Sequence, residues 1–139
     1  MDNIFVLKSE IFSLSLNLQV FESDIACPTN TIIYVSVSSA GFSASASMDV
    51  DIKEISKFCD ELNKVHSTLK GSAKIYEPFG NKQYIGFTGD GCGHILISGM
   101  LDSNGAHGFW QELKFENSID QTYFPKFLKG LTEYVKQYH

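Results

Sequence analysis

The chain follows one order of elements twice: short alternating segments and then one amphipathic helix. In the first half GFSASASMDV leads into KFCDEL, and in the second half GFWQELKFEN leads into KFLKGL. We therefore expect one domain over residues 1–139, with a weak internal repeat of a four-strand-plus-helix unit over 1–70 and 71–139. Because strands, turns and helices account for most motif-like residues, few residues remain for chemistry.

Apolar residues at every second position predict strands with one face in water. The clearest example is the segment FSLSLNLQV. The eight expected strands are Ile4–Leu7, Phe12–Val20, Thr31–Ser38, Phe42–Met48, Ser72–Glu77, Gln83–Thr88, His94–Leu101 and Phe109–Phe115. In the fourth strand the inward residues Ala44 and Ala46 are small, so we expect a bulky element such as a helix to approach the sheet there.

Two helices are expected, each after four strands. The first runs from about Asp51 to Leu69, with apolar residues at helical spacing, Asp51 as its N-cap and Gly71 just past its end. The second runs from about Asp120 to Tyr138, with Pro125 in its first turn. The sequence thus predicts an α+β fold of order ββββαββββα. Since eight strands rarely stay flat, we expect the antiparallel strands to form either one strongly curved sheet or two sheets, with both helices packed on the sheet.

Charge and cysteine usage argue against several classes of function. The net charge is −5, all 11 basic residues are lysines, and no arginine is present to read phosphates or bases, so we expect no nucleic-acid partner. The 3 cysteines form no CxxC pair, which is typical of a reducing cytosol. We see no signal peptide and no long apolar run, so we expect a cytoplasmic protein without a membrane partner.

Three motif-like features have structural explanations. The segment TGDGCGH lacks the GK[ST] end of a phosphate loop, and its Asp-Gly pair indicates a hairpin turn. Cys92 and His94 could share a strand face, but no further residues have metal-ligand spacing. Asp49, Asp51 and Glu54 gather at a helix start, where acids favour the helix dipole. We therefore expect no catalytic residue, no cofactor and no metal.

The sequence allows two interpretations of Trp110. Alternation places Phe109, Leu113 and Phe115 on one face of the last strand, and Trp110 on the other face with Glu112 and Glu116. We favour a Trp110 that is covered by long side chains of a neighbouring strand. The alternative is an exposed tryptophan flanked by acids, which would suit an anchor for a protein partner.

From Gly41 to the C-terminus the chain resembles the WapI-type immunity proteins of bacterial polymorphic toxin systems. The residues that carry the resemblance are the segments DIKEISKFCDELNKV, LKGSAKIYE, GHILISGML and LKFENSIDQTYFPKFLKGL. Residues 1–40 match only as strands that precede the first helix, and the DGC segment before Gly93 departs from the pattern. The resemblance implies a small cytoplasmic antitoxin that binds and blocks a cognate toxin domain, often a nuclease.

We therefore expect a non-enzymatic immunity protein, monomeric or weakly dimeric. The alternatives are a small-ligand-binding domain with an aromatic-lined cavity and an enzyme whose site residues the sequence does not reveal. Since a nuclease has a basic substrate groove, its inhibitor should present acids. The candidate partner-binding residues are Trp110, Glu112 and Glu116, and after them Asp49 and Asp51.

Overall fold

Two four-stranded antiparallel sheets and two α-helices form the fold. The computed structural model describes residues 3–78, 82–103 and 108–138. Sheet A contains β1 (Ile4–Lys8), β2 (Phe12–Val20), β3 (Thr31–Ser39) and β4 (Phe42–Val50). Sheet B contains β5 (Ser72–Tyr76), β6 (Tyr84–Gly89), β7 (His94–Ser103) and β8 (Gln111–Asp120). Each sheet is a meander in which consecutive strands pair, so β1, β4, β5 and β8 are the edge strands.

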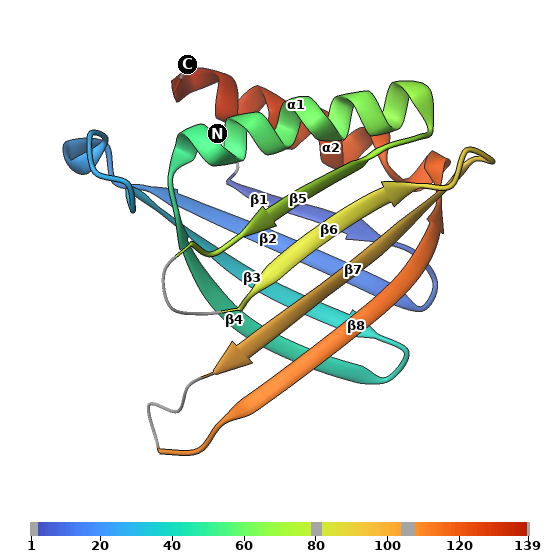
Figure 1. Cartoon of the computed structure of the whole chain (residues 1–139), viewed down its shortest axis with the longest axis horizontal. Coiled ribbons are helices and arrows are strands. Elements are labelled where there is room, and N and C mark those ends of the chain that lie inside the picture. The colour runs from blue at the N-terminus through green and yellow to red at the C-terminus, as the bar shows by residue number, and fades with distance from the viewer. Residues whose placement is uncertain (1–2, 79–81, 104–107, 139) are drawn as a thin grey trace.

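The helices lie together along one side of the two sheets. Helix α1 (Ile52–Thr68) connects the sheets, and α2 (Pro125–Val135) follows the last strand. Short 3₁₀ turns are η1 (Glu22–Asp24), η2 (Gln121–Tyr123) and η3 (Lys136–Tyr138). In Figure 1 both helices run beside β1 and β5, while β4 and β8 lie on the side away from them. The predicted α+β class and antiparallel pairing are confirmed.

Of the two expected arrangements, the division into two sheets is correct and the strong curvature is wrong, and the element order differs in detail. The eight strands divide into two sheets of four, a number that an open sheet accommodates without curling. β8 begins at Gln111 and pairs with β7 as far as Asp120. The Asp120 carboxylate accepts a hydrogen bond from the Thr122 amide at 2.9 Å and starts η2. The helix expected from Asp120 therefore begins only at Pro125, between two 3₁₀ turns.

Alternation places the apolar faces of both sheets in a common interior. In β2 four apolar side chains are buried and their serine and asparagine neighbours are half-buried. In β4 the inward Ala44 and Ala46 are half-buried and pack at the edge of the core. The bulky element expected beside them is not a helix, because β4 approaches β7. The small alanines instead line a groove between the sheets.

Helix α1 packs on sheet B, and α2 contacts both sheets. Helix α1 lies against β5 and β6, and α2 lies against β1. Phe87 of β6 is fully buried at the centre of this arrangement. Its ring centroid is 5.8 Å from that of Phe58 in α1, 5.7 Å from that of Phe124 and 6.3 Å from that of Phe127 in α2. The aromatic residues thus join both helices to sheet B.

Asn30 fixes the start of α1 from a distance in sequence. Its side chain is fully buried, and its Oδ1 accepts hydrogen bonds from the Ile52 amide and the Thr31 hydroxyl, both at 2.8 Å. Its Nδ2 donates to the Asp51 carboxylate at 3.1 Å and to two carbonyls of the loop before β3. Asp51 accepts from the Lys53 amide at 2.9 Å, which confirms the predicted N-cap. The loop, β3 and α1 are therefore held together by one amide.

We expect Gly99→Ala to destabilise the fold by about 1–3 kcal/mol, because an added methyl group overpacks the core. A Cβ at Gly99 would lie 2.5 Å from Cζ of Phe115, its cross-strand partner, and 2.8 Å from the Tyr84 carbonyl oxygen. Chemical denaturation measures the change. Gly86→Ala in the adjacent strand is the control, since its nearest neighbour would be 3.7 Å away. Equal destabilisation of both variants would contradict this account of the packing.

Candidate functional site

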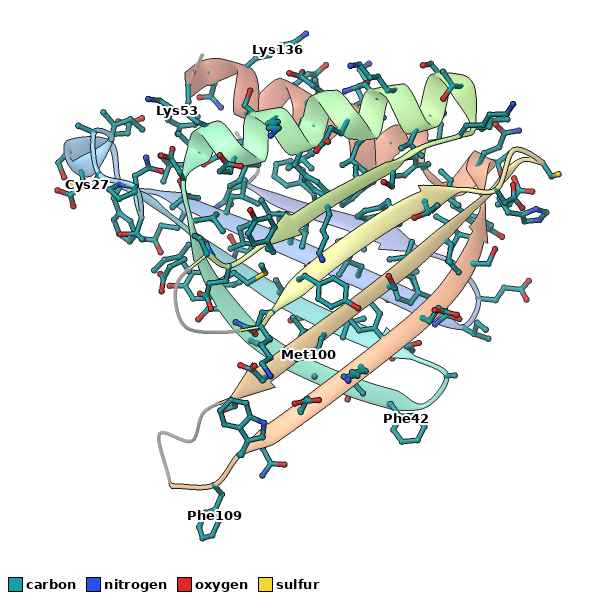
Figure 2. All side chains as sticks on the ribbon, in the orientation of Figure 1. Cys27, Phe42, Lys53, Met100, Phe109 and Lys136 are labelled. Atoms are coloured by element: carbon teal, nitrogen blue, oxygen red, sulfur yellow. The ribbon has the colours of Figure 1, made fainter. Side chains whose placement is uncertain are left out.

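Trp110 is exposed, not covered by neighbouring side chains as we favoured. It directly precedes β8 and is 57% exposed, and its Nε1 lies 3.5 Å from Oε2 of Glu112. Phe109, which was expected to face inward, is also exposed because β8 starts after it. Figure 2 shows Phe42 and Phe109 projecting from the side of the molecule opposite the helices. Large apolar side chains in water at this end are typical of an interaction surface.

Two predicted acids lie on the outer face of sheet B. Glu112 and Glu116 are exposed in β8, on the face opposite the buried Phe115. Lys114 lies between them on the same face, so the strand alternates in charge there. In the register with β7, Glu112 is opposite Asp102 and Glu116 is opposite Ser98. Like charges directly opposite each other destabilise a sheet, so the pairing of Glu112 with Asp102 is unfavourable for the fold.

Asp102 at the end of β7 is buried, and no residue that the structure describes forms a hydrogen bond with its carboxylate. The residue is 8% exposed, and neither side-chain oxygen has a partner among the described residues. Burial raises the pKa of Asp102, and the charges of Glu77 and Glu112 raise it further. A buried carboxylate that lacks both a counter-ion and a donor costs stability unless another molecule supplies them.

A polar network connects this acid to the edge of sheet A. Gln83 is 2% exposed, and its Oε1 accepts from the Asp102 amide at 3.1 Å. Its Nε2 donates to the Ser47 carbonyl of β4 at 2.8 Å and to Glu77 at 3.3 Å. The Glu77 carboxylate also accepts from the Asp49 amide at 2.7 Å. Two side chains that flank the β5–β6 connection therefore satisfy backbone groups on the edge strand β4.

The two acids of the second predicted surface, at the start of α1, have different roles. The Asp49 side chain is exposed on β4, and its amide contacts Glu77. The Asp51 carboxylate caps α1 and accepts from Asn30, so it is already engaged within the fold. Asp49 is thus linked to the surface around Trp110 through Glu77, Gln83 and Asp102, whereas Asp51 has a structural role.

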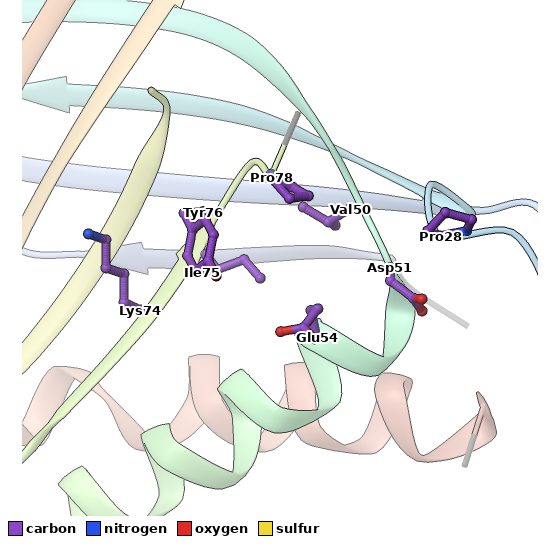
Figure 3. Close-up of a pocket in the computed structure, with 8 residues that line it drawn as sticks. All are labelled: Pro28, Val50, Asp51, Glu54, Lys74, Ile75, Tyr76 and Pro78. Carbon is purple, nitrogen blue, oxygen red and sulfur yellow. The ribbon is translucent and has the colours of Figure 1, made fainter. Parts of the chain in front are cut away.

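Two open hollows adjoin these surfaces. A cleft of about 260 Å³ beside the start of α1 is lined by Pro28, Val50, Asp51, Glu54, Lys74, Ile75, Tyr76 and Pro78 (Figure 3). A groove of about 260 Å³ between β4 and the ends of β7 and β8 is lined by Phe42, Ser43, Ala44, Ser45, Ala46, Leu101, Asp102, Ser103, Gln111, Glu112 and Leu113. Each has one aromatic residue in its lining. The phenylalanines around Phe87 pack on one another, so they do not line a ligand cavity of the kind considered as an alternative.

Cys92 lies in the β6–β7 turn, and His94 is the first residue of β7. Asp90 Oδ1 accepts from the amides of Cys92 at 2.6 Å and His94 at 3.1 Å, and these bonds lower the pKa of Asp90. His94 Nδ1 lies 3.5 Å from Asp90 Oδ2. Gly91 and Gly93 have positive φ, as the predicted turn requires. Among the residues that the structure describes, no group of three or more His, Cys, Asp or Glu side chains is placed to hold a metal ion.

Comparison with known proteins identifies the family. The model of the immunity protein WapI-like family matches residues 8–139, and the chain belongs to this family. The match confirms the resemblance and extends it over the first sheet, where the residues alone showed only strands. No curated protein and no solved structure matches the chain. No helix within the described ranges is long and apolar enough to cross a membrane.

Sequence reasoning missed the residues beneath the exposed site. Asp102 precedes a polar, glycine-containing segment, and Gln83 and Glu77 flank a turn, so all three read as ordinary surface residues. Their burial depends on the approach of β4 to sheet B, which no local pattern records. The available signal was the position of Asp102 directly after the buried Met100 and Leu101, at the end of an apolar strand.

We expect Asp102→Asn to stabilise the protein at neutral pH. Since the folded state raises the pKa of Asp102, it binds this proton more tightly than the unfolded chain. The tighter proton binding stabilises the folded state at pH values below the ordinary aspartate pKa. This stabilisation is lost as the pH rises through the raised pKa of Asp102 in the folded protein. Thermal melts across this pH range should show a higher Tm for the variant at neutral pH and convergence with wild type in acid. Asp24→Asn, at an exposed position in η1, is the control, and a lower Tm for Asp102→Asn at neutral pH would contradict the argument.

Proposed function

We propose that this protein is an immunity protein that binds a cognate toxin domain in the cytoplasm of the producing bacterium and blocks it by stoichiometric association. Membership of the WapI-like immunity family is the observation that carries the proposal. Inhibition of this kind needs a complementary surface and no catalytic residue. The exposed Trp110 with its flanking acids, on the side of the molecule opposite the helices, is the surface that suits such a partner best.

The proposed binding surface combines an apolar anchor with negative charge. Trp110 offers a large, rigid ring with a polar N–H group, a residue type that is enriched at the energetic centres of interfaces. Glu112 and Glu116 supply charge on the same face of β8, and Asp49 is the second candidate at the edge of sheet A. If the toxin is a nuclease, these acids would occupy the basic groove that otherwise holds its substrate.

Co-expression tests the role directly. The toxin domain is expected to be encoded at the end of a neighbouring upstream gene, and its expression alone should arrest growth. Co-expression of the immunity protein should restore growth, and the two purified proteins should elute as one complex in size-exclusion chromatography. Growth arrest that persists at equal expression, with no complex, would contradict the proposed function.

We expect Trp110→Ala to keep a Tm close to that of wild type and to lose protection, because the ring is exposed in the free protein. Truncation of a central anchor commonly costs about 2 kcal/mol, or roughly thirtyfold in affinity. Calorimetric titration with the toxin domain measures the change. Tyr123→Ala, at another exposed aromatic residue beyond the opposite end of β8, should bind as wild type does. Early melting of Trp110→Ala would mean that the ring supports the fold.

The association rate should fall as salt concentration rises, because exposed acids steer a basic partner over a distance that salt shortens. Glu112→Gln combined with Glu116→Gln should lower the rate at low salt and flatten its salt dependence. Stopped-flow mixing with the toxin domain measures both effects. Glu133→Gln on α2, also exposed, is the matched control. A wild-type rate that is independent of salt would count against electrostatic steering.

A further inference from the structure

The groove between β4 and the ends of β7 and β8 has an unbalanced charge. Among the described residues that line it, the charged ones are Asp102 and Glu112, and none is a lysine. The two acids are cross-strand partners, and the adjacent pair, Leu101 and Leu113, is apolar. Ala44 and Ala46 of β4 form the facing wall. A ligand in the groove would therefore meet an apolar wall and two neighbouring carboxylates.

Asp102 is the second observation that points to a ligand. It is more than nine-tenths buried, yet both carboxylate oxygens lack a partner among the described residues. The charges nearest to it are repulsive, since Glu77 and Glu112 both raise its pKa. The only salt bridge between described residues, His94 with Asp90, lies at the other end of β7. Within residues 3–78, 82–103 and 108–138, no hydrogen bond and no salt bridge reaches the Asp102 carboxylate.

We propose that this groove receives a cationic side chain, lysine or arginine, of the toxin domain, and that Asp102 and Glu112 together neutralise its charge. This inference rests on the proposed function. The methylene stem of such a side chain would pack along the alanines and leucines while its head meets the acids, as long basic side chains do at amphipathic sites. Two adjacent carboxylates suit the fork of a guanidinium group in particular. Trp110, whose Nε1 approaches Glu112, lies beside the groove and adds an aromatic face for the cation.

The arrangement explains why an unfavourable acid is present. A charge that repels its neighbours in the free protein becomes favourable when the partner supplies the counter-charge. Neutralisation of Asp102 should then lower the affinity for the partner and raise the stability of the free protein. A residue with a purely structural role would not show this combination.

A titration that needs no toxin provides the first test. The chain contains 1 tryptophan and 6 tyrosines, so fluorescence excited at a wavelength that tyrosine does not absorb reports on Trp110 alone. N-acetylarginine amide should change this fluorescence in a saturable way at millimolar concentration, whereas the neutral isostere N-acetylcitrulline amide should bind at least tenfold more weakly. Asp102→Asn and Glu112→Gln should each weaken arginine amide binding severalfold, and Glu133→Gln should not. Equal binding of the two amides, or wild-type binding by Asp102→Asn, would overturn the inference.

The toxin domain provides the second test and separates the two proposals. Asp102→Asn should bind it at least tenfold more weakly than wild type while melting at a higher temperature. If wild type and Asp102→Asn bind the toxin equally, the groove inference fails and the immunity function stands. If wild type does not bind the toxin at all, the proposed function fails, and the amide titration alone decides whether the groove takes a cation.

Discussion

The fold depends on the burial of Phe87, a residue of sheet B, against both helices. Its ring contacts Phe58 of α1, Phe127 of α2 and Phe124 at the start of α2, so one side chain of β6 positions both helices. Truncation of a fully buried phenylalanine typically costs about 3–5 kcal/mol, a large fraction of the stability of a small protein. The helices cover this side of the molecule, and β4 and β8 are edge strands on the opposite side.

The polar network at that opposite side holds the two sheets in position without strand pairing. Gln83 and Glu77 bind Ser47 and Asp49 on the edge of β4, so the distance between β4 and β7 is set by side-chain hydrogen bonds. The same network holds the backbone of the buried Asp102, whose amide donates to Gln83. The hydrogen bonds that hold the edge of β4 therefore also bring Glu77 close to Asp102. A cationic partner would compensate the negative charge of these acids.

Local sequence patterns predicted the elements well and their assembly less well. The alternation in FSLSLNLQV and the helical stripe after Asp51 depend on neighbours in sequence, and both were correct. The division into two open sheets, the buried state of Asp102 and the role of Asn30 depend on contacts between distant segments, which alternation does not encode. We had favoured a covered Trp110 over an exposed one. The alternation within a strand shows which residues share a face, but it does not show which other elements cover that face. The family resemblance, which supplied the functional class, rested on residues with structural explanations of their own.

The packing of each helix against strands from the other half of the chain affects how the chain folds. Each sheet pairs only consecutive strands, so both meanders can form through contacts that are local in sequence, which favours rapid folding. The inner face of sheet A, rich in leucine and valine, remains uncovered during synthesis until sheet B is complete. Helix α1 packs on β5 and β6 of the second half, and α2 contacts both Phe87 of β6 and strand β1 of the first half. The final packing step therefore requires both halves at once, and a chain that stops after α1 would expose a hydrophobic sheet face prone to association with other chains.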